Sequence, residues 1–310
     1  YSVSVNDIDG DAVAMTATTK PDWLTISNSN SNSLSFDGVD DYVEISNTSD
    51  LEPTSQVTVS TWAYMDNWSS ASDSRIISNT QSGGFALAMD VSWNQNKLGF
   101  YINIDGSYLH PDIALSSLSS GWHHIVGTYD NRYAKLYIDG SLVDIVDNGS
   151  NVGISYGSDI NLFIGAEPID ANNSTSLYFD GFINEVSIFN TALNQSEIQA
   201  NMSNELTGNE NGLVGYWNFN EGIGPTVTDQ TSNGNDGTIT GASWSTDVAY
   251  SSYVLSGTPG PSDGGLHNVI LSADDSNGGV ITQSFTVAVS VTHLDIDGES
   301  GFRLLSSPIS

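Results

Sequence analysis

The two ends of the chain read as two parts of one small β-domain, separated by about 220 residues. Residues 1–27 contain an alternating strand, an acidic loop and a Pro-Asp-Trp-Leu segment. From about Tyr253 the chain continues with Leu-Ser-Gly-Thr-Pro and a final alternating strand. Closing a long loop costs little free energy, whereas opening a folded sandwich costs much. The intervening residues must therefore fold on their own, with their two ends close together.

This order of segments resembles the cadherin-like, immunoglobulin-like modules that repeat along large bacterial surface proteins. In those modules the Trp-Leu strand runs within a few residues into the Leu-Ser-Gly-Thr-Pro turn. The resemblance implies a split host module made of residues 1–32 and 247–294, with residues 33–246 as the insert. Residues 295–310 are expected to be a linker or the start of a next module.

The charge of the chain limits its partners. There are 37 acidic residues against 6 basic ones, which gives a net charge of -31. This balance argues against binding nucleic acid or an anionic membrane surface and favours cations. The chain has no cysteine, so neither disulfides nor thiolate metal sites can stabilise it. A metal would need oxygen ligands, and Ca²⁺ is the leading cofactor candidate.

The sequence also bears on localisation. No apolar stretch approaches the roughly 20 residues that span a bilayer, so we expect no membrane insertion. Residue 1 opens directly into a strand pattern rather than a signal peptide. We therefore expect a monomeric module, cut from a longer secreted or cell-surface chain whose neighbouring modules are its partners.

Short alternating runs recur along almost the whole chain, between clusters of Gly, Asn, Asp and Ser. This spacing predicts an all-β sandwich or jelly roll. One short surface helix is predicted within residues 191–202, with Asn194 as its N-cap and Glu197 in the capping-box position.

Several of these runs form an ordered set of motifs. The set is similar to the laminin-G-like, concanavalin A-like domains of bacterial extracellular proteins. The resemblance implies an all-β fold: a concanavalin A-like jelly-roll sandwich inserted in a smaller immunoglobulin-like or cadherin-like β-sandwich. The motifs are LSFDGVDDYVEI (34–45), GWHHIVGTYD (121–130), AKLYIDGSLV (134–143), LFIGAEP (162–168) and FDGFINEVSIFNTALNQSEI (179–198).

A further block of this family, GLVGYWNFNEG and the residues after it (212–245), usually precedes the Phe-Asp-Gly strand, but here it comes last. If the sandwich closes, this segment returns beside the strand that starts at Leu34. That return would bring the two ends of the insert together. The alternative is that the block begins a second, truncated copy of the domain.

The resemblance also implies that the motifs at 34–45 and 179–198 lie side by side, at an edge where carboxylates and carbonyls commonly hold calcium. The candidate ligands are Asp37, Asp40, Asp180 and Glu185. Such a metal would be structural. The competing interpretation is that the Asp-Gly pairs only form tight turns.

A second candidate calcium site lies in the host module. Asp7, Asp9 and Asp11 alternate along a turn, as at the start of an EF-hand loop, but no Glu stands at the twelfth position. The cadherin-like resemblance implies that this loop holds calcium near a module junction together with Asp274 or Asp275. The alternative is a polar hairpin turn.

The sequence lacks the motifs of common enzymes. It contains no Glu-x-Asp-x-Glu strand of the kind that glycosidases with this sandwich use, and no cysteine nucleophile. The Gly-x-Ser-x-Gly pattern occurs at 153–157 and 260–264, but no helix is predicted after either match, as a nucleophile elbow requires. We therefore expect no catalysis.

Binding remains, and carbohydrate is the first ligand class to consider because sugars stack on aromatic rings and bond to Asp and Asn. Aromatic and polar residues in polar loops are the ligand-binding candidates: Trp68, Trp93, Tyr108, His110 and Asp112. Such loop aromatics can equally cap the edge of a sandwich.

Two main hypotheses follow. In the first, the insert is a calcium-stabilised, lectin-like head that binds glycans on a cell or matrix as part of a bacterial adhesin. In the second, the unit is a spacer or protein–protein interaction module of a large surface protein. An accessory domain of a secreted glycoside hydrolase is a further alternative.

Overall fold

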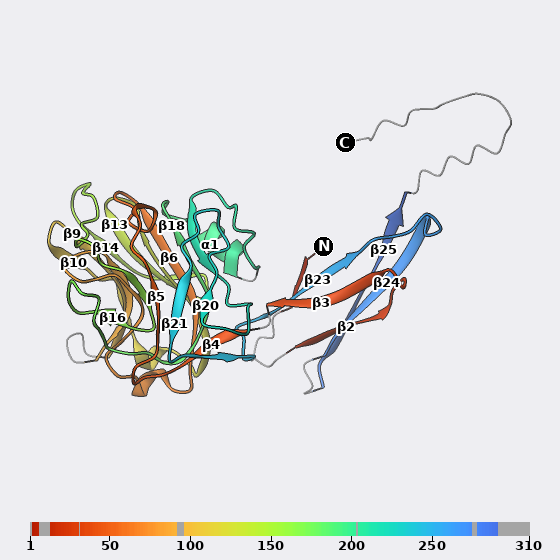
Figure 1. Cartoon of the computed structure of the whole chain (residues 1–310), viewed down its shortest axis with the longest axis horizontal. Helices are drawn as coiled ribbons and strands as arrows, with labels where there is room; N and C mark the ends of the chain where they lie inside the picture. The colour runs from red at the N-terminus through yellow and green to blue at the C-terminus, as the bar shows by residue number, and fades with distance from the viewer. Residues whose placement is uncertain are drawn as a thin grey trace, which may run out of the picture.

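The structure is a computed structural model that describes residues 2–5, 13–30, 32–91, 96–202, 204–274 and 278–290. It is almost entirely β, as predicted, and consists of a large part, β4 to β22 with helix α1, and a small part, β1 to β3 with β23 to β25. Figure 1 shows the small part extending from one end of the large part. Among the described residues, no helix has the length and apolar character needed to cross a membrane.

The large part is a sandwich of two mainly antiparallel sheets. The eight-stranded sheet has the order β14 (Ser141–Asp147), β13 (Tyr133–Ile138), β12 (Gly121–Tyr129), β6 (Val57–Met65), β18 (Asp180–Phe189), β4 (Ser33–Asp37) and β22 (Ser243–Ser245), with β19 (Leu213–Trp217) paired to β18. The nine-stranded sheet has the order β10 (Ser107–Leu109), β9 (Lys97–Ile104), β8 (Phe85–Asp90), β7 (Ser74–Ser78), β15 (Leu162–Ile164), β5 (Tyr42–Ile45), β21 (Gly237–Thr240) and β20 (Thr226–Val227), with β11 (Asp112–Ala114) paired to β9.

Short elements complete the large part. They are the two-stranded pair β16 (Glu167–Pro168) and β17 (Thr175–Ser176) and the single-turn 3-10 helices η1 (Ser49–Leu51), η2 (Trp68–Ser70) and η3 (Leu115–Ser117).

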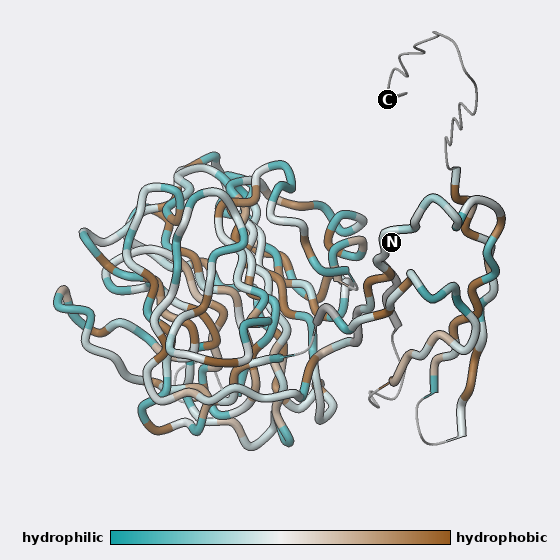
Figure 2. Tube along the Cα trace, turned by 45° about the vertical axis from the view of Figure 1, so that its right-hand side comes forward, coloured by the Kyte–Doolittle hydropathy of each residue, from teal (hydrophilic) through white to brown (hydrophobic). Residues whose placement is uncertain are grey.

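One hydrophobic core lies between the two sheets. Successive side chains of a strand point to opposite faces, so alternate residues of β9 enter the core. Leu98, Phe100 and Ile102 are fully buried there, whereas Tyr101 faces outward and is half-buried. Figure 2 shows the hydrophobic segments gathered inside the large part and the hydrophilic ones in its loops. Each buried Leu, Ile or Phe stabilises the fold by about 1.5 to 3 kcal/mol, so this core dominates the stability of the large part.

Helix α1 (Gln195–Met202) covers part of the outer face of the eight-stranded sheet. The Asn194 side chain accepts hydrogen bonds from the backbone N–H groups of Ser196 and Glu197, at 2.9 and 3.1 Å. The Glu197 carboxylate accepts one from the Asn194 N–H at 2.8 Å. These bonds form the predicted capping box. Ile198 is the buried anchor of the helix and packs with Val126 of the sheet.

The segment 212–245 returns beside the first strands of the large part, as predicted. Strand β22 pairs with β4 so that Trp244 lies opposite Leu34, and β21 pairs with β5. Strand β18 lies on the other side of β4, with Asp180 opposite Asp37. The motifs at 34–45 and 179–198 are therefore neighbours.

The small part contains two three-stranded sheets. One has the order β1 (Ser2–Val5), β23 (Ser251–Gly257) and β3 (Leu24–Asn30), and the other β2 (Ala14–Thr19), β24 (Gly265–Asp274) and β25 (Val280–Val289). Strands from both ends of the chain share one small core of Met15, Leu24, Leu255, Val269 and Leu271.

The two connections between the parts run next to each other. Ser252 of β23 lies opposite Asn30 of β3, and Ser245 of β22 lies opposite Ser33 of β4. The Ser33 hydroxyl donates to the backbone oxygen of Asp247 at 2.5 Å, which joins the two connections directly.

Candidate functional site

A cleft of about 780 Å³ opens on the outer face of the nine-stranded sheet. This volume lies within the range of small-ligand sites. The strand period of two places the side chains of Arg75, Ala86 and Tyr101 on this face, opposite to the core residues of the same strands. The cleft is lined by Asp73, Arg75, Thr80, Ala86, Asp90, Tyr101, Tyr108, His110, Glu167 and Leu177.

Three rings line the cleft. The rings of Tyr101 and His110 stack with their centroids 5.5 Å apart and their planes at 24°. Tyr108 is 37% exposed, and its hydroxyl donates toward the backbone oxygens of Thr80 and Gly83, at 2.6 and 2.7 Å. These bonds fix the ring at the rim of the cleft.

Arg75 lies between two carboxylates of the cleft. Its Nη1 is 3.5 Å from Asp90 Oδ1, and its Nε is 3.4 Å from Glu167 Oε1. The Thr80 hydroxyl donates to the same Glu167 oxygen at 2.9 Å. The side chains of Arg75, Asp90 and Glu167 are only 12%, 16% and 20% exposed, so this group is held in place. The cleft thus combines rings with ordered polar groups, the surroundings that a sugar ring requires.

The structure separates the residues that the sequence proposed for ligand binding. Tyr108 and His110 line the cleft. Asp112 does not line it; its carboxylate pairs with Lys97 Nζ at 2.6 Å and lies 3.8 Å from Nδ1 of His110. Trp93 lies outside the described residues.

The prediction that Trp68 forms part of a ligand surface is wrong. Its side chain is 1% exposed and belongs to the hydrophobic core. The indole N–H donates to the Gly121 oxygen at 3.2 Å, and the ring packs edge-on against His123. Its polar neighbours in the sequence form the turn η2, which directs the ring inward.

Sequence reasoning missed most of the residues that line the cleft, among them Arg75, Asp90, Tyr101 and Glu167. These four residues lie in strands, whereas the candidates predicted from the sequence stand in segments expected to be polar loops. Arg75, Asp90 and Tyr101 occupy strand positions whose side chains point away from the core, and this alternation is the sequence signal that could have identified them. Glu167 lies in a two-residue strand and has no such signal.

The second candidate feature is an acidic edge. The carboxylates of Asp37, Asp40 and Asp41 place oxygen atoms within 4.8 Å of one another. Burial raises the pKa of Asp41, and the charges of Asp37 and Asp40 add to that rise. The donor set, three carboxylates around one point, fits the hard oxygen ligands that Ca²⁺ takes.

Asp180 stands next to this edge. It lies opposite Asp37 in the sheet, and a Cβ added to Gly38 would meet the Cβ of Asp180 at 3.0 Å. Gly38 also has φ of +76°, which glycine adopts without strain. The turn bonds are present as well, since Asp37 accepts from the Val39 N–H and Asp41 from the Asp37 N–H, each at 2.9 Å.

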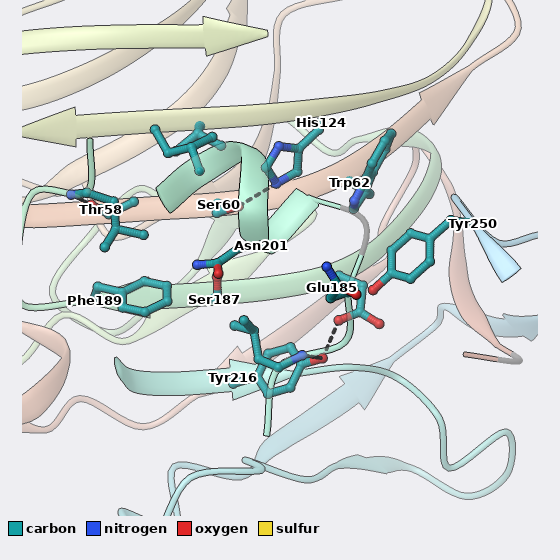
Figure 3. A pocket seen from close by; sticks show the side chains of 15 residues that line it. Thr58, Ser60, Trp62, His124, Glu185, Ser187, Phe189, Asn201, Tyr216 and Tyr250 are labelled. Atoms are coloured by element: carbon teal, nitrogen blue, oxygen red, sulfur yellow. Dashed lines mark hydrogen bonds between the residues drawn. The ribbon is translucent and has the colours of Figure 1, made fainter. Parts of the chain in front are cut away.

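The prediction that Glu185 binds metal with Asp37 and Asp180 is wrong. Beyond Asp180, β18 is irregular between Asn184 and Ser187, and Glu185 has φ of 54°. Its side chain lies beneath α1, where the Tyr216 hydroxyl donates to it and the Tyr250 ring faces it (Figure 3). Burial raises the pKa of Glu185 to about 8, so the group is neutral at pH 7.

The cavity beside Glu185 has a volume of about 20 Å³, enough for one water molecule and too small for a sugar. Glu185 Oε1 and His124 Nδ1 have no hydrogen-bond partner within the described part of the chain. The other ring nitrogen of His124 bonds to the Ser60 hydroxyl at 2.9 Å, and burial lowers the pKa of His124 to about 4. This is a buried polar cluster inside the fold.

The second predicted calcium site is only partly visible. Asp274 is exposed at the end of β24, opposite Ala14 at the start of β2. The other predicted ligands, Asp7, Asp9, Asp11 and Asp275, lie outside the described residues.

Comparisons with known proteins relate the large part to one family. The sequence model of the family described as Laminin_G_3, concanavalin A-like lectin/glucanases superfamily, matches residues 36–199. A search of curated proteins found no match.

A search of solved structures found similar proteins. A Bacteroides ovatus protein to which carbohydrate binding has been attributed has a TM-score of 0.56 and 19% identity, over 70% of this chain and 60% of its own length. A heptameric pentraxin from Limulus polyphemus has a TM-score of 0.42 and 17% identity, over 55% of this chain and 81% of its own. The CBM40 domain of a Ruminococcus gnavus sialidase, bound to α2,3-sialyllactose, has a TM-score of 0.40 and 16% identity, over 55% of this chain and 97% of its own.

Proposed function

The chain belongs to the concanavalin A-like lectin/glucanases superfamily, and on this basis we propose that it is a non-catalytic, extracellular carbohydrate-binding module. The observation that carries the proposal is the cleft on the nine-stranded sheet, where the stacked rings of Tyr101 and His110 lie beside the ordered Arg75 group. The carbohydrate binding attributed to the Bacteroides ovatus protein, which shares this fold, agrees with it.

The chemistry of the cleft fits a pyranose. The apolar face of a sugar ring packs on an aromatic ring, while its hydroxyls exchange hydrogen bonds with charged and polar groups. Tyr101 and Tyr108 supply aromatic surface, and Asp90 and Glu167 supply acceptors. The carboxylates of the cleft are bound within the fold rather than placed as a general acid and base pair: Asp90 and Glu167 pair with Arg75, and Asp73 accepts from the Val91 N–H.

A glycan array followed by calorimetry tests the proposal. Tyr101→Ala removes one ring of the stack and should weaken binding of the array hit by roughly tenfold, by analogy with the about 1 to 3 kcal/mol that a base gains by stacking on one aromatic ring. Tyr133→Ala, which removes a half-buried ring from the other sheet, is the matched control and should leave affinity unchanged. An array without hits, for a protein that remains folded, would exclude the proposal.

We further propose that Ca²⁺ stabilises the acidic edge, with Asp37, Asp40, Asp41 and Asp180 as the ligand candidates. A cation there would offset the mutual repulsion that adds to the raised pKa of Asp41. A bound ion stabilises the folded state by mass action, by about 2.7 kcal/mol at a hundredfold excess over the dissociation constant.

Thermal unfolding with calcium and with EDTA tests this site. Calcium should raise the melting temperature by several degrees, and Asp40→Asn should abolish that rise because it removes an exposed carboxylate of the cluster. Asp50→Asn, an exposed carboxylate in η1, serves as the control. A melting temperature that does not respond to calcium contradicts the proposal.

The role of the small part is also a proposal. We infer that it is a split cadherin-like or immunoglobulin-like module, residues 1–32 and 247–294, which carries the large part as the head of a cell-surface or secreted adhesin. The shared core of strands from both chain ends and the adjacent connections support this inference. If glycans do not bind, the second candidate function is a spacer or a protein–protein interaction module. The same two connections would then hold the large part in place within that module.

A further inference from the structure

We infer that the cleft selects neutral glycans, in which hydroxyls are the only polar groups, and rejects glycans that carry carboxylate or sulfate. The inference rests on the proposed function and deepens it, because it names the class of sugar from the charges around the rings. It concerns the cleft between Arg75, Asp90, Glu167 and Tyr101.

Carboxylates outnumber strong cations in the cleft. Arg75 is the one Lys or Arg among the described lining residues, whereas Asp73, Asp90 and Glu167 all line the same space. Arg75 already pairs with two of these carboxylates, at 3.5 and 3.4 Å. An anionic sugar would therefore meet an excess of negative charge, and like charges brought together across an interface cost several kcal/mol.

The geometry of Arg75 also disfavours an anion. A guanidinium binds a carboxylate best through two parallel N–H bonds. Nε and Nη1 of Arg75 already face Glu167 and Asp90, so a second carboxylate would have to displace one of them. These two side chains are largely buried, and displacing either would leave a desolvated charge without its partner.

Sugar hydroxyls, in contrast, fit the hydrogen-bonding atoms that Arg75, Asp90 and Glu167 still have available. Nη2 of Arg75 has no hydrogen-bond partner among the described residues, and it can donate to a hydroxyl oxygen. Asp90 and Glu167 can accept hydroxyl protons with the oxygens that do not contact Arg75. The net charge of -31 adds a long-range repulsion that slows the approach of any anionic glycan.

The test compares glycans that differ only in charge. Sialyllactose and oligogalacturonate are each compared with their carboxyl-reduced forms by calorimetry, guided by an array that contains neutral and acidic glycans. Neutral members should bind roughly tenfold or more tightly than their acidic counterparts. This difference in affinity should become smaller at about 0.5 M NaCl, where the Debye screening length falls to roughly 4 Å.

Glu167→Gln distinguishes the effect of charge inside the cleft from the effect of the net charge of the protein on the binding of acidic glycans. It keeps the acceptor for Thr80 but frees Arg75 from one carboxylate, so acidic glycans should bind about fivefold more tightly while neutral ones do not gain. Asp50→Asn changes the net charge by the same amount, but Asp50 does not line the cleft and is far from it in sequence. This variant should leave the ratio of neutral to acidic glycan affinities unchanged. Tighter binding of the acidic members overturns the inference but keeps the proposed function, whereas binding of neither class overturns both.

Discussion

At the scale of single residues, Glu185 gives this protein a distinctive pH dependence. Burial raises its pKa to about 8 in the folded state, whereas the pKa in the unfolded chain is about 4.3. The folded state therefore holds a proton that the unfolded chain has released, and the unfolding free energy falls as pH rises between these values. The stabilising contribution is fully present below the unfolded pKa and is lost as pH rises through about 8.

Glu185→Gln should remove this dependence, because the neutral amide has nothing to ionise. Urea unfolding between about pH 6.5 and 8 should show the wild type losing roughly 2 kcal/mol more than the variant. His124 contributes equally to the wild type and the variant, because its pKa is lowered to about 4 in the folded state and returns to about 6.5 in both unfolded chains. Asp50→Asn is the control and should keep the wild-type slope, and an equal slope for Glu185→Gln would contradict the assignment.

At the scale of elements, alternation and capping predicted most of the structure. The capping box at Asn194 and the pairing of the Leu34 strand with segment 212–245 follow from local chemistry and from motif order. Alternation also separates the core side chains of β9 from Tyr101. The capping box and the alternation depend on residues close together in sequence, whereas the pairing of Leu34 with Trp244 joins distant residues and was predicted from the order of the family motifs.

The candidate site was less predictable, because it joins elements that are distant in sequence. Arg75 pairs with Asp90 of the neighbouring strand and with Glu167 of a strand pair much later in the chain. The local sequence pattern does not predict either contact. For Trp68 the prediction erred in the other direction. Its neighbours in the sequence are polar, which suggested an exposed ring, but the η2 turn buries it. For Glu185, an irregularity within β18 turned a predicted ligand into a buried neutral group.

At the scale of the whole molecule, the two connections decide how the large part is presented. Because both run from the small part and are joined by the Ser33 bond to Asp247, the large part has two tethers. Tyr250 adds a third constraint. This residue of the second connection is 6% exposed and packs against Trp62 of the large part, with ring centroids 6.1 Å apart. Its hydroxyl faces Glu185 (Figure 3).

Tyr250 should therefore act as the residue that fixes the angle between the two parts. Tyr250→Ala removes both the ring contact with Trp62 and the hydroxyl beside Glu185, so the distribution of distances between the parts should broaden. Tyr250→Phe keeps the ring and should broaden it much less. The chain has no cysteine, so spin labels on Asp50→Cys and Thr282→Cys would report on one distance between the parts. An equally narrow distribution in Tyr250→Ala would show that the paired connections alone hold the large part in place.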